Sequence, residues 1–212
     1  MKQNEKIRPG SRARKRNDIL VAGKKVFLER GYGATSMDEI ALQANVSKRT
    51  VYDKFENKQT LFAAVVQEIC ERIAPPEFLA TDMHKDVKTV LTQFGEWFLT
   101  RIYSIEQVNL FQTVINDSRQ FPEIGDMFLS GPVLRTQTAL AAYLAAQVQK
   151  GRLALKDPQI AAALLIAMMK SDVHMTLLLG QSRSNLPKLI RQHVATAVSL
   201  FLTGAQNPKE RS

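Results

Sequence analysis

The residues best suited to chemistry in this chain of 212 residues lie in a short row between positions 47 and 58. They carry hydroxyl groups, cations and one phenol: Ser47, Lys48, Arg49, Thr50, Tyr52, Lys54 and Lys58. Such side chains donate to phosphate oxygens and to the acceptor atoms of the DNA major groove. We therefore predict DNA binding by these residues, joined by Ser36 just upstream.

The sequence contains no set of residues with the spacing of a known catalytic site. The sequence contains no glycine-rich phosphate loop, no nucleophile elbow and no pair of carboxylates at catalytic spacing. His84, His174 and His193 lie far apart, whereas a metal site needs ligands at helical or loop spacing. We expect no enzymatic activity, no metal and no cofactor.

Local signals predict the helices that position the candidate row. Thr35 or Ser36 can cap a first helix, and Glu39 completes a capping box with Ser36. Asn45 tolerates the left-handed backbone that ends helices, and Ser47 caps a second helix. The spacing predicts two short helices joined by a tight turn.

The second helix has an inner and an outer face. Val51 and Phe55 lie four residues apart and face inward beside Val46, which leaves the polar row outward. Asn57 caps a third helix whose first turn carries Lys58. A cation opposes the helix dipole there, so we expect Lys58 to serve an anion outside the protein.

From Ile19 to Phe62 the chain resembles the DNA-binding domain of the TetR/AcrR family of transcriptional regulators. The matching positions are Ile19, Ala22, Phe27, Gly31-Tyr32, Thr35-Ser36, Ile40-Ala41, Ala44, Val46-Ser47, Thr50, Tyr52, Phe55, Lys58 and Leu61-Phe62. The resemblance implies that the helix at 47–53 enters the major groove, and that Thr50, Tyr52 and Lys58 contact phosphates.

Three residues depart from the family's pattern. Asn45 stands where Gly is usual, and Asp53 stands where aromatic residues or His are frequent. Arg49 stands where Gly or another small residue is common. A long cation at this position is a candidate for reading a guanine.

Charge and composition agree with a soluble DNA-binding protein. Residues 1–62 hold 14 Lys and Arg against 7 Asp and Glu, and the net charge of the chain is +9. This surplus favours contact with phosphate, and residues 1–18 lack the apolar face of a membrane-surface helix. The single cysteine, Cys70, fits a buried residue in a reducing compartment. Since the apolar run Ile160–Met169 is too short to span a bilayer, we expect a cytoplasmic protein with no membrane contact.

The periodicity predicts an all-α fold in three parts. We expect residues 1–12 to form a basic flexible arm, residues 13–74 a three-helix helix-turn-helix domain that ends before Pro75-Pro76, and residues 75–212 a larger helical domain. The resemblance to the family implies that this larger domain binds a ligand and dimerises. The first helix should run from Ser11 to Arg30 and stop at Gly31. Later helices are predicted near 58–74, 84–103, 105–118, 122–129, 132–150, 157–180 and 185–203.

The segment from Leu110 to Ile166 resembles the AefR-like C-terminal domain of the same family. This implies a cavity for an apolar small-molecule effector, with candidate lining residues Phe94, Trp97, Phe98, Phe111, Gln112, Asn116, Phe128 and Met168. The alanine-rich stretches 139–148 and 161–169 allow close helix approach in a homodimer.

Together these observations predict a homodimeric, ligand-responsive regulator that binds a double-stranded DNA operator. We expect a repressor that an apolar small molecule releases from a palindromic operator. The alternatives are an activator or partner-regulated member without a small ligand, and a non-specific architectural DNA binder.

Overall fold

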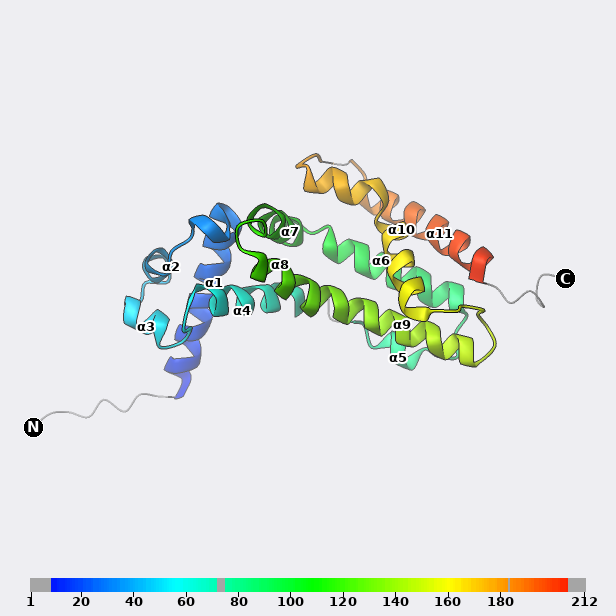
Figure 1. Cartoon of the computed structure of the whole chain (residues 1–212), viewed down its shortest axis with the longest axis horizontal. Helices are drawn as coiled ribbons and strands as arrows, with labels where there is room; N and C mark the ends of the chain where they lie inside the picture. Colours follow the sequence, from blue (N-terminus) through cyan, green and yellow to red (C-terminus); the bar gives the residue numbers. More distant parts are fainter. Residues whose placement is uncertain (1–8, 72–74, 183, 206–212) are drawn as a thin grey trace, which may run out of the picture. The chain divides into compact units, whose positions relative to one another are not determined.

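Every regular element is helical in the computed structural model, which describes residues 9–71, 75–182 and 184–205 (Figure 1). The all-α prediction is therefore confirmed, and the predicted basic arm at residues 1–12 lies largely outside the described residues. The elements are α1 (Pro9–Ala34), α2 (Met37–Gln43), α3 (Lys48–Tyr52), α4 (Lys58–Glu71), α5 (Phe78–Thr81), α6 (Val87–Ile102), α7 (Ile105–Asp117), α8 (Pro122–Phe128), the π-helical turn η1 (Leu129–Val133), α9 (Leu134–Gln149), α10 (Pro158–Leu178) and α11 (Leu186–Ala205).

The contacts divide the chain into two compact units. Unit 1 comprises the chain up to Ile69 together with Leu110–Phe128, and unit 2 comprises Cys70–Asn109 together with the chain from Leu129 onward. The end of α7 and all of α8 therefore belong with the helix-turn-helix. The predicted domain boundary between residues 74 and 75 stays a prediction.

The core of unit 1 gathers aromatic rings around the end of α1. The Phe27 and Tyr32 rings each meet the Phe62 ring edge-on at 5.0 Å. Phe121, which precedes α8, adds its ring edge-on to Tyr32 at 5.0 Å. These contacts bury apolar area from helices that are distant in sequence, which is the main favourable term in folding.

Gly31 ends the regular part of α1, as the sequence predicts, because its backbone is left-handed with φ 85° and ψ 170°. That region is essentially reserved for glycine. A Cβ at Gly31 would lie 2.9 Å from Oδ2 of Asp117, the last residue of α7. The carboxylate of Asp117 accepts the backbone N–H of Tyr32 at 2.8 Å and that of Gly33 at 3.2 Å.

Unit 2 is a bundle in which α6 packs against α10 and α11. Gly95 of α6 permits the closest approach, since a Cβ there would lie 2.7 Å from Cγ1 of Val194 on α11 and 3.0 Å from Met169 on α10. Leu91, Leu99 and Leu144 are fully buried in the same core. Cys70 is buried as well, and its burial raises the pKa of the thiol to about 11.

A kink divides α10 at Ser171, which the sequence did not predict. Ser171 has φ 47° and ψ −152°, so the backbone leaves the helical conformation there. The hydroxyl of Tyr103 donates to the carbonyl of Lys170 at 2.8 Å. The Tyr103 ring stacks on His174, and burial together with nearby Lys170 lowers the pKa of His174 to about 4.

The same helix is apolar around much of its circumference. By length and composition α10 is the one helix of the described residues that could cross a membrane, although 28% of that window is buried in the structure. The predicted apolar run, Ile160–Met169, is thus part of a longer apolar helix. Ile160, Leu164 and Met175 of this helix are exposed to solvent in the single chain.

Most predicted helices lie within a few residues of the observed ones, and three features were missed. The sequence did not reveal α5, the π-helical turn η1 or the kink at Ser171. The first is only 4 residues long, and the second includes Pro132 and Gly131, which the sequence argument treated as a break. Tertiary packing decides the conformation of such short segments.

Candidate nucleic-acid interface

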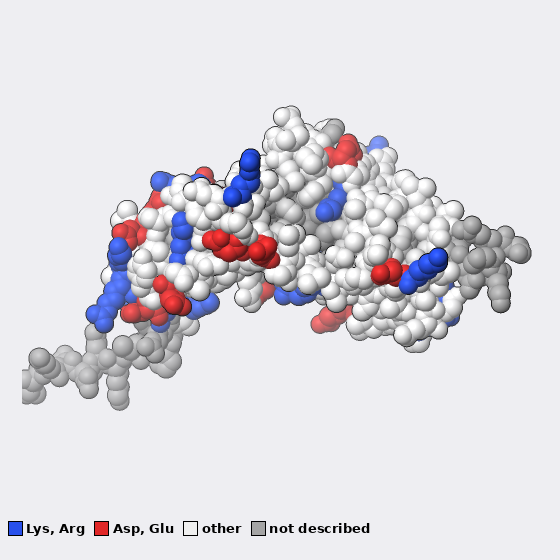
Figure 2. Space-filling view, viewed as in Figure 1, with Lys and Arg blue, Asp and Glu red and all other residues white. Residues whose placement is uncertain are grey.

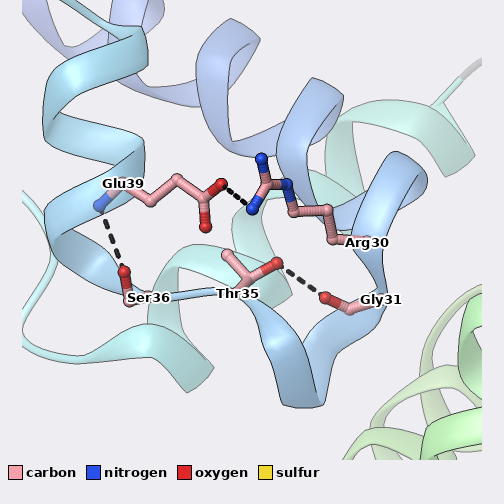
Figure 3. A network of polar contacts seen from close by, with 5 residues as sticks. All are labelled: Arg30, Gly31, Thr35, Ser36 and Glu39. Carbon is pink, nitrogen blue, oxygen red and sulfur yellow. Dashed lines mark hydrogen bonds and ion pairs between the residues drawn. The ribbon is translucent and has the colours of Figure 1, made fainter.

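The first helix of the predicted motif begins at Ser36. Its Oγ accepts the backbone N–H of Glu39 at 3.2 Å, while the Thr35 hydroxyl donates to the carbonyl of Gly31 at 2.6 Å (Figure 3). The carboxylate of Glu39 turns instead to Arg30 of α1 at 2.7 Å. Ser36 is therefore the cap, and Glu39 joins α2 to α1 through an ion pair.

The turn between α2 and α3 has a left-handed residue where the sequence predicts one. Asn45 has φ 51°, and its N–H donates to Leu42 O at 3.1 Å. The N–H of Val46 donates to Ala41 O at 3.0 Å. These two bonds form a Schellman motif, which fixes the direction in which the chain leaves α2.

Short α3 is held by its cap and by its inner face. Ser47 Oγ accepts the N–H of Thr50 at 3.2 Å and lies 2.8 Å from the Thr50 hydroxyl oxygen. Val51 is fully buried, and the guanidinium of Arg16 lies 5.0 Å over the Phe55 ring. An isolated helix of 5 residues would not be stable in water, so this anchoring holds the helix in place.

The anchored inner face directs the predicted row outward. Lys48, Arg49 and Tyr52 are exposed, and Thr50 and Lys54 are half-buried. Ser36 and Ser47 are exposed as well. Unit 1 therefore brings all seven of these candidates onto α3 and its immediate surroundings.

The cations of α3 differ in their surroundings. The Lys48 ammonium lies 2.8 Å and 2.9 Å from the two carboxylate oxygens of Asp38, on α2. The hydrogen bond and the negative charge of Asp38 raise the pKa of Lys48. Within the residues that the structure describes, the Arg49 guanidinium has no ion-pair partner. Figure 2 shows basic and acidic side chains interspersed over unit 1.

Lys58 makes contacts that the sequence argument did not foresee. Its ammonium donates to the carbonyls of Tyr32 at 2.9 Å, Thr35 at 3.0 Å and Gly33 at 3.4 Å. It also lies 4.5 Å over the Tyr32 ring. The charge of Lys58 is unfavourable at the N-terminal end of the α4 dipole. It is favourable beside the carbonyl groups at the C-terminal end of α1. A phosphate contact by Lys58 stays a prediction.

The eight predicted ligand-binding residues fall into both units. In unit 2 the rings of Phe94 and Phe98 stack at 5.7 Å within the core, and Phe94 lies 6.1 Å from Trp97. Met168 is exposed on α10. In unit 1 the rings of Phe111 and Phe128 meet edge-on at 4.8 Å, Gln112 is half-buried and Asn116 is exposed.

Among these residues, Trp97 lines an open groove of about 510 Å³ in unit 2. Phe78 of α5 lies in the same groove, and the Arg101 guanidinium lies 4.7 Å over the Trp97 ring. Phe78 and Arg101 were not predicted from the sequence. Arg101 could have been found, because it follows Trp97 by four residues on a helix.

Two family descriptions match the chain. Residues 19–65 match "Bacterial regulatory proteins, tetR family", and residues 89–204 match "AefR-like transcriptional repressor, C-terminal domain". Together these matches include α2, α3 and every helix from α7 to α10.

Solved structures and a curated relative that resemble this chain are also regulators. A putative TetR-family regulator from Mesorhizobium loti superposes with a TM-score of 0.80 at 25% identity and covers 92% of this chain and 98% of its own. The flavonoid-responsive regulator FrrA gives 0.79 at 28% identity, with 92% and 99% covered. The transcriptional activator FasR of Mycolicibacterium smegmatis is 46% identical over 56 residues, which are 26% of each chain.

The contacts of Lys58 lead to a prediction with two separate readouts. Lys58→Met keeps the aliphatic stem but removes the ammonium, so the carbonyls at the end of α1 lose a charged donor. We expect the free energy of unfolding to fall by about 1–3 kcal/mol, measured by denaturant unfolding.

The salt dependence of DNA binding tests the phosphate contact independently. If Lys58 also contacts phosphate, the slope of log K against log salt falls by about one in the variant. Gln59→Met, at the exposed neighbouring position, controls for the new side chain and should change neither quantity. Unchanged unfolding with Lys58→Met would contradict the capping role.

Proposed function

The chain belongs to the TetR family of bacterial regulatory proteins, and from that premise we propose that it is a homodimeric repressor that an apolar small molecule releases from a palindromic operator. The observation that carries the DNA-binding part is the outer face of α3. Its hydroxyl groups and cations point away from Val51, which anchors the helix in the core. A recognition helix requires such a polar face on a fixed support.

Arg49 is the proposed reader of sequence. It is exposed on α3, and its side chain is not occupied by an ion pair within the described part of the chain. An arginine in the major groove binds the two acceptors of guanine at once. Tyr52, Thr50 and Lys54 are proposed to contact phosphates, which sets the register of the helix on DNA.

The exposed face of α10 supports a homodimer. Ile160 and Leu164, one turn apart, are each 58% exposed, and Met168 follows one turn later. Leu200 on the adjacent helix α11 is 62% exposed. Exposed apolar side chains of this kind mark an interface, and a second copy related by a twofold axis would cover them. The alanine-rich stretch 161–169 lies on this helix, whereas much of 139–148 is in the core of unit 2.

The proposed effector is an apolar aromatic molecule. FrrA, which resembles this chain along nearly its whole length, is flavonoid-responsive by description. Trp97 and Phe78 offer flat apolar surfaces in the groove of unit 2, beside the guanidinium of Arg101. Release requires the effector to favour the state that does not bind DNA, typically by about 1–3 kcal/mol.

An activator is the runner-up function. FasR is described as a transcriptional activator, and it shares 46% identity over 56 residues with this chain. A member regulated by a protein partner, and an architectural DNA binder without sequence preference, are the further alternatives. In each case we place the protein in the cytoplasm, where its DNA is.

The roles of Arg49 and Tyr52 predict different losses. Arg49→Ala should relax specificity at one base pair, so that discrimination there falls by about 1–3 kcal/mol. Tyr52→Phe removes a single hydroxyl and should weaken binding to operator and scrambled DNA alike. Gel shifts on operator, single-base variants and scrambled DNA measure both. Equal loss on all of these duplexes for Arg49→Ala would contradict base reading.

The apolar face of α10 predicts the outcome of a charge placed on it. Leu164→Asp should convert the protein to monomers, because a buried carboxylate without a partner costs several kcal/mol. Light scattering after size-exclusion chromatography measures the mass. Ile105→Asp is the matched control, since Ile105 is 81% exposed on α7, and this variant should remain dimeric. A wild-type monomer would refute the proposed dimer.

Trp97 gives an internal reporter for the effector, since it is the single tryptophan of the chain. Added flavone should change the Trp97 fluorescence saturably and lower operator affinity by about 5- to 150-fold, the usual range of coupling. Phe78→Ala should weaken flavone binding and leave DNA affinity without flavone unchanged. Release of DNA with no change in fluorescence would place the effector elsewhere.

A further inference from the structure

Two carboxylates in the first turn of α2 have different partners. Glu39 is paired with Arg30 of α1, so it joins helices behind the DNA-reading surface. Asp38 points to α3, where both of its oxygens lie within 2.9 Å of the Lys48 ammonium. Both partners of this second pair are more than 60% exposed. Asp38 is therefore a negative charge beside the row of DNA-binding candidates.

Protein stability alone is a poor explanation for this pair. An exposed ion pair of lysine and aspartate contributes about 0–1 kcal/mol, and often nothing measurable. On a surface that meets phosphates, the carboxylate also repels DNA and neutralises one cation. Its presence opposes general affinity for DNA, which rests on phosphate contacts.

Lys48 is the side chain that would gain from such a constraint. It is the first residue of α3, and the N-terminal residues of a recognition helix are those that contact base edges. A lysine is a flexible stem with a compact charge, and without a partner it would turn to the nearest phosphate. The Schellman motif at Asn45 and the cap at Ser47 fix the two helices that carry Asp38 and Lys48.

We propose that Asp38 is a specificity-determining residue of the DNA-reading surface. It holds the Lys48 ammonium at the start of α3. The ammonium N–H that does not point to Asp38 then faces a base acceptor instead of a phosphate. Without Asp38, Lys48 becomes one more phosphate contact that serves every sequence equally. This inference rests on the proposed operator binding.

The test compares Asp38→Asn with wild type on two kinds of DNA. One probe is a duplex enriched by the wild-type protein from a random 30-base-pair library, and the other is the unselected library. Asp38→Asn should raise affinity for the library and steepen its salt slope by about one. The ratio of enriched to library affinity should fall about 10-fold, as for loss of one base contact.

Two further variants separate positioning from simple charge removal. Asp53→Asn removes the same charge from the C-cap of α3, where Asp53 is exposed, and should raise both affinities without changing their ratio. Lys48→Ala should lower the ratio by itself. Asp38→Asn added to Lys48→Ala should lower it no further, because Asp38 acts through Lys48.

The outcomes are distinct. If wild type enriches no sequence, the proposed operator binding fails. If a sequence is enriched but Asp38→Asn leaves the ratio unchanged, as Asp53→Asn does, the proposed role of Asp38 is refuted. A further drop of the ratio in the double variant would also refute it. Thermal unfolding by circular dichroism confirms that each variant is folded.

Discussion

The end of α1 is a junction where backbone groups of one short segment need partners from two other helices. The carbonyls of Tyr32, Gly33 and Thr35 accept from the Lys58 ammonium at the start of α4, and two N–H groups donate to Asp117 at the end of α7. Buried backbone groups without partners are costly, so these two charged side chains make the turn possible. The glycine conformation at Gly31 and the aromatic contacts around Tyr32 depend on it.

The DNA-reading surface likewise depends on support from neighbouring elements. A helix of 5 residues has no stability of its own, and it persists because its neighbours fix both ends and bury Val51. The turn at Asn45 sets its direction, and ion pairs join α2 to its neighbours on both sides. Outward side chains such as Arg49 take no part in these contacts, and a regulator can use them for recognition.

Local chemistry made the first half of the molecule predictable. The caps at Ser36 and Ser47, the left-handed Asn45 and the inward Val51 each follow from residues within four positions, and the structure confirms them. The partners of Lys58 and Asp117 could not be found in this way. Lys58 contacts carbonyls more than twenty residues earlier, and Asp117 lies 85 residues from Tyr32. The ligand residues were harder still, because aromatic residues at helical spacing fit a core and a pocket equally well, and Phe94 lies in a core.

The junction at the end of α1 also bears on how such proteins diversify. Lys58 and Asp117 bind main-chain atoms of Tyr32, Gly33 and Thr35. The contacts by which these two residues hold the junction do not involve the outward side chains of α3. Substitutions at exposed positions such as Arg49 can therefore accumulate without disturbing the junction at the end of α1. A fold arranged in this way lets an old scaffold acquire a new target by a few substitutions, which makes the reading helix an exchangeable part.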